Sequence, residues 1–188
     1  MAALMEWNLP NTLTWTRIAA IPLIVLLFYM PYPWADQAAG LLFAAAGVTD
    51  SLDGYFARRW GQISRLGAFL DPVADKLIVA VALVLLVSRD ARWFIVLTAI
   101  VIIGREITIS ALREWMAEIG ARRKVAVSQL GKYKTILQIT GLSMMLYHWP
   151  LSGLPTYRIG VVLTVIAAAA TLVSMLVYLR AAWPELKR

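Results

Sequence analysis

Four aspartates, Asp50, Asp53, Asp71 and Asp75, lie close together in a chain that is otherwise rich in apolar residues. At about 100° per helical residue, Asp50 and Asp53 share one helix face, and Asp71 and Asp75 share a face of the helix that follows. Small residues accompany both pairs: Gly54 and Ala57 on the first face, Ser64 and Gly67 on the second. We therefore expect the two faces to approach closely and to hold a cation between them.

Paired carboxylates at this density are typical ligands of hard divalent cations. Four carboxylates carry a formal charge that two divalent ions would balance, and oxygen donors suit Mg²⁺, Mn²⁺ or Ca²⁺, whereas zinc normally uses His or Cys. Metal ions in such a site can polarise phosphoryl oxygens and position a nucleophile. A structural alternative is an interfacial salt-bridge network with the nearby basic residues Arg58, Arg59, Arg65 and Lys76.

The composition indicates a membrane protein. Hydrophobic residues make up 61% of the 188 and charged residues 15%, against roughly 45–50% and about 25% in soluble domains. Cysteine is absent, which excludes disulfides, zinc-thiolate sites and thiol nucleophiles, and the single histidine, His148, excludes a histidine cluster.

We predict an all-α integral membrane protein with one domain over residues 1–188. Spans of about 20 residues fit a hydrocarbon core of roughly 30 Å. The six spans are expected at about 12–30, 35–60, 64–87, 93–116, 132–148 and 157–180. The first residues show no basic segment before an apolar one and no evident cleavage site, so we expect the first helix to be retained.

Basic residues are concentrated in the connections on one side of these spans: Arg58, Arg59, Arg65, Arg113, Arg122, Arg123, Lys124, Lys132 and Lys134. The opposite turns, 31–34 and 149–155, are nearly uncharged, and Arg89 and Arg92 in the third are partly offset by Asp90. The positive-inside rule therefore places both termini and the four aspartates on the cytoplasmic side.

The pattern Asp50-x2-Asp53-Gly54-x2-Ala57-Arg58-x8-Gly67-x3-Asp71-x3-Asp75 resembles the complete signature of the CDP-alcohol phosphotransferases. This resemblance implies the fold of that family: six transmembrane helices, usually in a homodimer, around a polar cavity open to the cytoplasm. It also implies a two-metal site, with Mg²⁺ or Mn²⁺, that transfers a phosphatidyl-type group from a CDP-linked donor to an alcohol and releases CMP.

The resemblance assigns a role to each matching position. The four aspartates would bind the metals, and Asp75 would also act as general base on the attacking hydroxyl. The donor would be held by residues from the first three helices: Asn11, Thr14, Gly54, Ala57, Arg58 and Ser64. A guanidinium beside a diphosphate gives charge-assisted hydrogen bonds, and glycine admits a flat base.

Similarity outside the signature extends along nearly the whole chain, in stretches such as NLPNTLTWTRI, GREITISALREWMAE and VSQLGKYKT. It is strongest to the bacterial members that use CDP-diacylglycerol and sn-glycerol 3-phosphate. This acceptor carries a phosphate, so we expect extra cations in the pocket, and the candidates are Arg105, Lys132 and Lys134. Alternatively, Arg105 pairs only with Glu106 or extends toward the interface, and the two lysines are topology signals.

The expected partners are therefore CDP-diacylglycerol, glycerol 3-phosphate, membrane lipids and a second copy of the chain, in a bacterial inner membrane, with no nucleic acid. One rival within the family is an acceptor such as inositol, inositol phosphate or serine. A rival of another class is a cation transporter that uses the four acids. The lack of matching polar residues on the opposite side argues against a path through the membrane.

Overall fold

The computed structural model describes the backbone of residues 9–60, 65–121 and 129–186; within these ranges, the side chains of 9–11, 13, 50–60, 65–69, 129–132 and 186 are outside the description. The described residues form six α-helices and no strand, as the sequence predicted. The helices are α1 (Leu9–Tyr29), α2 (Pro33–Trp60), α3 (Arg65–Arg89), α4 (Trp93–Glu118), α5 (Gln129–Tyr147) and α6 (Thr156–Leu186).

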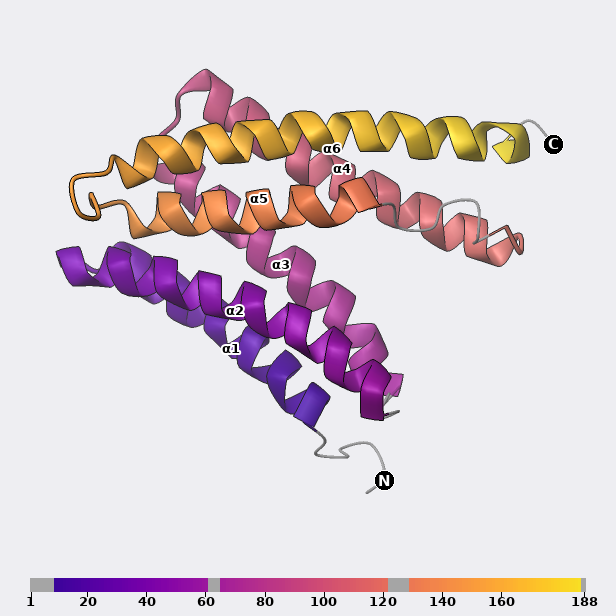
Figure 1. The fold of residues 1–188 in the computed structure, drawn as a ribbon, viewed down its shortest axis with the longest axis horizontal. Coiled ribbons are helices and arrows are strands. Elements are labelled where there is room, and N and C mark those ends of the chain that lie inside the picture. Colours follow the sequence, from indigo (N-terminus) through magenta and orange to yellow (C-terminus); the bar gives the residue numbers. More distant parts are fainter. Residues whose placement is uncertain (1–8, 61–64, 122–128, 187–188) are drawn as a thin grey trace.

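Consecutive helices run in opposite directions, so that the α1–α2, α3–α4 and α5–α6 turns lie at one end of the molecule, on the left of Figure 1. Side chains connect these turns. Asp36 at the start of α2 accepts hydrogen bonds from Arg89 at 2.7 Å and from Trp149 at 3.2 Å. Tyr157 at the start of α6 donates to Asp90 at 2.7 Å. We call these five residues the turn clasp.

The clasp includes one strongly perturbed carboxyl group, in the short α3–α4 turn. Hydrogen bonds from the Arg92 side chain, at 2.6 to 3.0 Å, lower the pKa of Asp90 to about 2. Asp90 is therefore ionised throughout the neutral pH range and remains an acceptor for Tyr157. The clasp joins all three turns at the end of the molecule where the sequence places few net charges.

A core of buried apolar residues connects α1, α2, α3, α4, α5 and α6 and includes Ile24, Phe43, Leu86, Ile102 and Leu142. Large apolar side chains are also exposed along all six helices, for example Leu26, Leu41, Val84, Ile100 and Val173. Among the described residues, α4 and the Thr156–Glu185 part of α6 are each long and apolar enough to cross a membrane. That α1, α2, α3 and α5 also cross it remains a prediction.

Helices α5 and α6 approach each other through glycine. A Cβ on Gly141 of α5 would lie 2.5 Å from the Thr164 hydroxyl oxygen and 2.9 Å from the Gly160 carbonyl oxygen of α6. Contacts this short do not occur in real structures, so the backbones are close because neither Gly141 nor Gly160 carries a side chain. Close approach at small residues is a common basis of helix association in membranes.

We expect Gly141→Ala to destabilise the protein by about 1–3 kcal/mol, because the added methyl group must push α5 away from α6. Thermal unfolding in detergent, followed by circular dichroism, would measure this. Gly104→Ala in α4 is the matched control, since its Cβ would meet nothing within 4 Å. That control should be neutral or stabilising by up to about 1 kcal/mol, as alanine favours the helix. Equal stability of the two variants would show that Gly141 is not a close-contact position.

Candidate active site in a cavity between the helices

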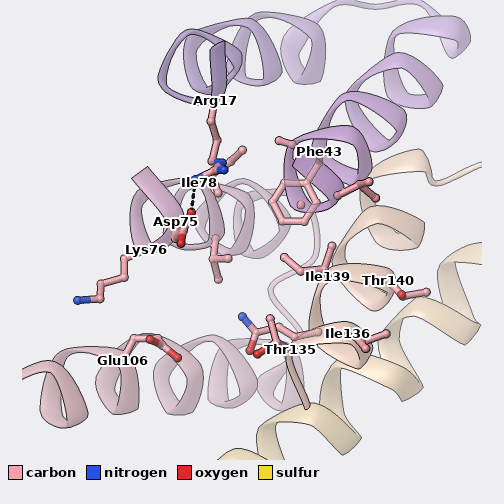
Figure 2. Close-up of a pocket in the computed structure, with 15 residues that line it drawn as sticks. Arg17, Phe43, Asp75, Lys76, Ile78, Glu106, Thr135, Ile136, Ile139 and Thr140 are labelled. Atoms are coloured by element: carbon pink, nitrogen blue, oxygen red, sulfur yellow. Dashed lines mark hydrogen bonds and ion pairs between the residues drawn. The ribbon is translucent and has the colours of Figure 1, made fainter. Parts of the chain in front are cut away.

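A cavity of about 440 Å³ opens between α1, α2, α3, α4 and α5. Its ionisable lining residues come from three helices: Arg17 of α1, Asp75 and Lys76 of α3, and Glu106 of α4. Figure 2 shows Arg17 above Asp75, with Glu106 on the opposite wall. The rest of the lining is mainly apolar, with Phe43, Ile78 and Ile139 from α2, α3 and α5, and polar Thr135, Gln138 and Thr140 from α5.

The described acid pair of α3 is held by one turn of α1. The Thr14 hydroxyl donates to Asp71 Oδ1, and an Arg17 guanidinium nitrogen lies 2.5 Å from Asp75 Oδ1. Thr14 and Arg17 are three residues apart and Asp71 and Asp75 four apart, so each pair occupies one face of its helix. Asp71 and Asp75 both contact the same turn of α1, as expected if they share a face.

The burial of these side chains differs between the two helices. Thr14 is 1% exposed and Arg17 2%, whereas the Asp75 side chain is 39% exposed. The Asp75 carboxylate is therefore accessible from the cavity, whereas the two α1 side chains that contact the acid pair are almost fully buried. A buried arginine in an apolar helix is expensive unless it has an anionic partner, and Asp75 is that partner here.

Arg17, like Glu106, is an ionisable cavity residue that the sequence did not single out as a site residue. Arg17 lies within the first predicted span, and the salt-bridge alternative for the aspartates named only Arg58, Arg59, Arg65 and Lys76. A signal was present: a charged residue three positions after Thr14, and so on the same helix face, within an otherwise apolar segment.

For the other acid pair and most donor-binding candidates, the structure describes the backbone but not the side chains. The backbone carries Asp50, Asp53, Gly54, Ala57 and Arg58 in the final turns of α2, but their side chains lie outside the described residues, as do those of Asn11 and Lys132. Ser64 lies outside them entirely. Four residues separate the end of α2 from the start of α3, so both acid pairs lie within about three helical turns of this short connection.

Two candidate acceptor-binding cations are described, and neither lines the cavity. Arg105 is 7% exposed and bonds Glu106 and, at 3.4 Å, the Ser174 hydroxyl of α6. Its pairing with Glu106 matches the alternative reading of the sequence. Lys134 is 6% exposed, and its ammonium group has no hydrogen-bond partner among the described residues. It lies one helical turn from Gln138, which does line the cavity.

The donor atoms of this site suit a hard divalent cation. Asp71 and Asp75 supply carboxylate oxygens on one face of α3, and His148, the sole histidine, lies in the α5–α6 turn beside Tyr157 of the clasp. Within the described side chains, which include neither Asp50 nor Asp53, no three acids or histidines come together. The described pair is therefore compatible with half of the four-carboxylate site that the sequence predicts.

Comparison with known proteins gives a consistent result. A family model described as CDP-alcohol phosphatidyltransferase matches residues 7–177. Proteins named CDP-diacylglycerol--glycerol-3-phosphate 3-phosphatidyltransferase from Escherichia coli strain K12, Shigella flexneri serotype 5b and Shigella boydii serotype 4 are each 49% identical over 182 residues. The match covers 97% of this chain and 98% of each relative.

Proposed function

Because the chain belongs to the CDP-alcohol phosphatidyltransferase family, we propose that it transfers the phosphatidyl group of CDP-diacylglycerol to sn-glycerol 3-phosphate. The products are phosphatidylglycerophosphate and CMP. The observation that carries this proposal is the 49% identity, over nearly the full length of both chains, to relatives named for this reaction. The cavity that Asp75 lines is the site at which we place the transfer.

In the proposed reaction, a hydroxyl of glycerol 3-phosphate attacks the phosphorus that carries diacylglycerol. A bond forms between that oxygen and phosphorus, the bond from phosphorus to the CMP oxygen breaks, and Asp75 accepts the hydroxyl proton. Arg17 holds the Asp75 carboxylate through Oδ1, so the base has a fixed position before the acceptor arrives. Correct orientation of a reacting group is a large part of catalysis.

Members of this family generally depend on divalent metal ions. Asp50, Asp53, Asp71 and Asp75 are the residues that we propose to bind two Mg²⁺ or Mn²⁺ ions. When bound, such ions would polarise the phosphoryl oxygens and offset the charge that develops on the leaving CMP. Arg58 is proposed to contact the donor diphosphate, and Asn11, Thr14, Gly54, Ala57 and Ser64 to border the nucleotide.

The acceptor phosphate needs cations, and of the two candidates whose side chains are described, Arg105 and Lys134, Lys134 has an ammonium group without a hydrogen-bond partner among the described residues. A buried ammonium without a hydrogen-bond partner is unfavourable, and an anionic ligand would satisfy it. Lys132, two residues earlier on α5, and Arg105 remain further candidates. Arg105 would have to exchange at least one of its contacts with Glu106 and Ser174 to reach a ligand in the cavity.

The chain is a membrane protein, with helices capable of spanning a bilayer and membership of a lipid-synthesising family. We propose that all six helices span the bacterial inner membrane, with the turn clasp outside and both termini and the cavity mouth in the cytoplasm. The basic connections on one side and nearly uncharged turns on the other support this orientation. A homodimer is proposed from the resemblance alone.

The test is CMP release from CDP-diacylglycerol by the purified full chain with Mg²⁺ and one acceptor at a time. Glycerol 3-phosphate should support turnover, whereas serine, inositol and inositol phosphate should give background rates. Chelation of the metal with EDTA should abolish release, and added Mg²⁺ should restore it. Release that does not depend on glycerol 3-phosphate would overturn the assigned acceptor.

A further inference from the structure

A glutamate carboxylate lines the cavity in addition to Asp75 of the predicted metal site. Glu106 of α4 lines the cavity on the wall opposite Asp75 and Lys76 of α3 (Figure 2). From the sequence, Glu106 was expected only as a possible partner of Arg105. Its position in the cavity raises the question of what a second kind of acid does in a site for an anionic acceptor.

The Glu106 carboxylate is held by an ion pair with Arg105, and its side chain remains partly accessible. Arg105, which is 7% exposed, bonds the Glu106 carboxylate and also reaches the Ser174 hydroxyl of α6. The Glu106 side chain is itself 31% exposed. Adjacent residues of a helix point about 100° apart, so Arg105 can pack toward α6 while Glu106 faces the cavity. The carboxylate thus has a fixed direction and an accessible surface.

A carboxylate is a hydrogen-bond acceptor only, and it repels phosphate. In this cavity its useful partners are therefore hydroxyl or amine donors of a ligand. Glycerol 3-phosphate has two hydroxyl groups, of which one attacks the donor and the other takes no part in bond formation. The attacking hydroxyl belongs near Asp75 on α3, on the other side of the cavity.

We propose that Glu106 is a specificity-determining residue that accepts a hydrogen bond from the secondary hydroxyl of the acceptor. The proposal rests on the function proposed above, because it presupposes glycerol 3-phosphate as acceptor. Arg105 then acts through Glu106, as a positioning residue. Glu106 and Arg105 together would orient the glycerol unit. Its primary hydroxyl would then meet Asp75, and its phosphate would meet the candidate cations Lys132 and Lys134.

The test compares two acceptors, glycerol 3-phosphate and 3-hydroxypropyl phosphate, which lacks only the secondary hydroxyl. The wild type should prefer glycerol 3-phosphate in kcat/KM by roughly ten- to a hundredfold, the range for a hydrogen bond to a charged group. Glu106→Gln should reduce this preference about tenfold, through a higher KM for glycerol 3-phosphate, because a neutral acceptor bonds a hydroxyl more weakly. Its kcat/KM for 3-hydroxypropyl phosphate should stay near the wild-type value.

Glu114→Gln is the matched control, since Glu114 lies exposed on the same helix and outside the cavity lining, and its preference should equal that of the wild type. An equal loss of activity toward both acceptors in Glu106→Gln would show that Glu106 only neutralises Arg105, and would overturn the proposal. An unchanged preference in the variant would overturn it too. If the wild type used neither acceptor, the proposed function would fail together with this assignment.

Discussion

Replacing Asp75 with Asn is expected to reduce kcat by a factor of at least about a thousand, because general-base catalysis alone contributes roughly 10²–10⁴. The amide cannot take the hydroxyl proton, and it is also a poorer metal ligand. The substitution is nearly isosteric, and Asp75 is 39% exposed, so the fold should be retained. The measurement is steady-state CMP release at saturating CDP-diacylglycerol and glycerol 3-phosphate.

Asp36→Asn serves as the control for this experiment. Asp36 is also a carboxylate bonded to an arginine, but it lies in the turn clasp at the other end of the molecule. Its kcat should remain near that of the wild type even if stability falls. Full turnover by Asp75→Asn would rule out the general-base role, whatever the acceptor.

Arg17→Gln is expected to lower kcat about a hundredfold, the size of effect seen when a reacting group is misplaced by about 1 Å. The reason is positional: without the guanidinium, the Asp75 carboxylate loses a contact that fixes its position. Arg17→Lys should recover part of the lost rate, since it retains the positive charge but not the planar fork of donors. KM for both substrates should change less than kcat.

Arg92→Gln tests whether loss of any arginine–carboxylate pair has this effect. Arg92 pairs with Asp90 in the exposed α3–α4 turn and is 54% exposed, so its kcat should be unaffected. If Arg17→Gln is folded and turns over at the wild-type rate, Arg17 is a structural counter-ion only. A lysine variant no better than glutamine would likewise argue against the positioning role.

The helices and the α3 acid pair could be predicted because both follow from local periodicity. Long apolar segments separated by polar or Pro- and Gly-containing turns define helices. A spacing of four places Asp71 and Asp75 on one face whatever the rest of the fold does. The structure has all six helices close to the predicted segments. Periodicity in one segment carries this information without any knowledge of its neighbours.

The partners of those acids could not be predicted in the same way. Thr14 and Arg17 meet Asp71 and Asp75 across 57 and 58 residues of sequence, and the contact depends on how α1 packs on α3. The basic residues nearest in sequence were the natural candidates, but Arg17 is the one that the fold brings to Asp75. Local spacing shows which residues share a face, and it does not show which helix lies opposite.

The choice between Arg105 and Glu106 illustrates the same limit at finer scale. They are adjacent in the sequence, so one must point about 100° away from the other, and the apolar pattern of α4 does not decide which faces the cavity. A phosphate-binding role made Arg105 the natural candidate. In the structure Glu106 lines the cavity and Arg105 bonds Ser174.

The most direct test of the proposed reaction is identification of its lipid product. Purified wild-type chain, reconstituted with CDP-diacylglycerol, Mg²⁺ and isotopically labelled glycerol 3-phosphate, would be assayed by mass spectrometry for the lipid and by chromatography for CMP. We predict labelled phosphatidylglycerophosphate and CMP in equal amounts, with neither formed by Asp75→Asn above background. CMP without labelled phosphatidylglycerophosphate would contradict the assignment of glycerol 3-phosphate as the group that attacks the donor.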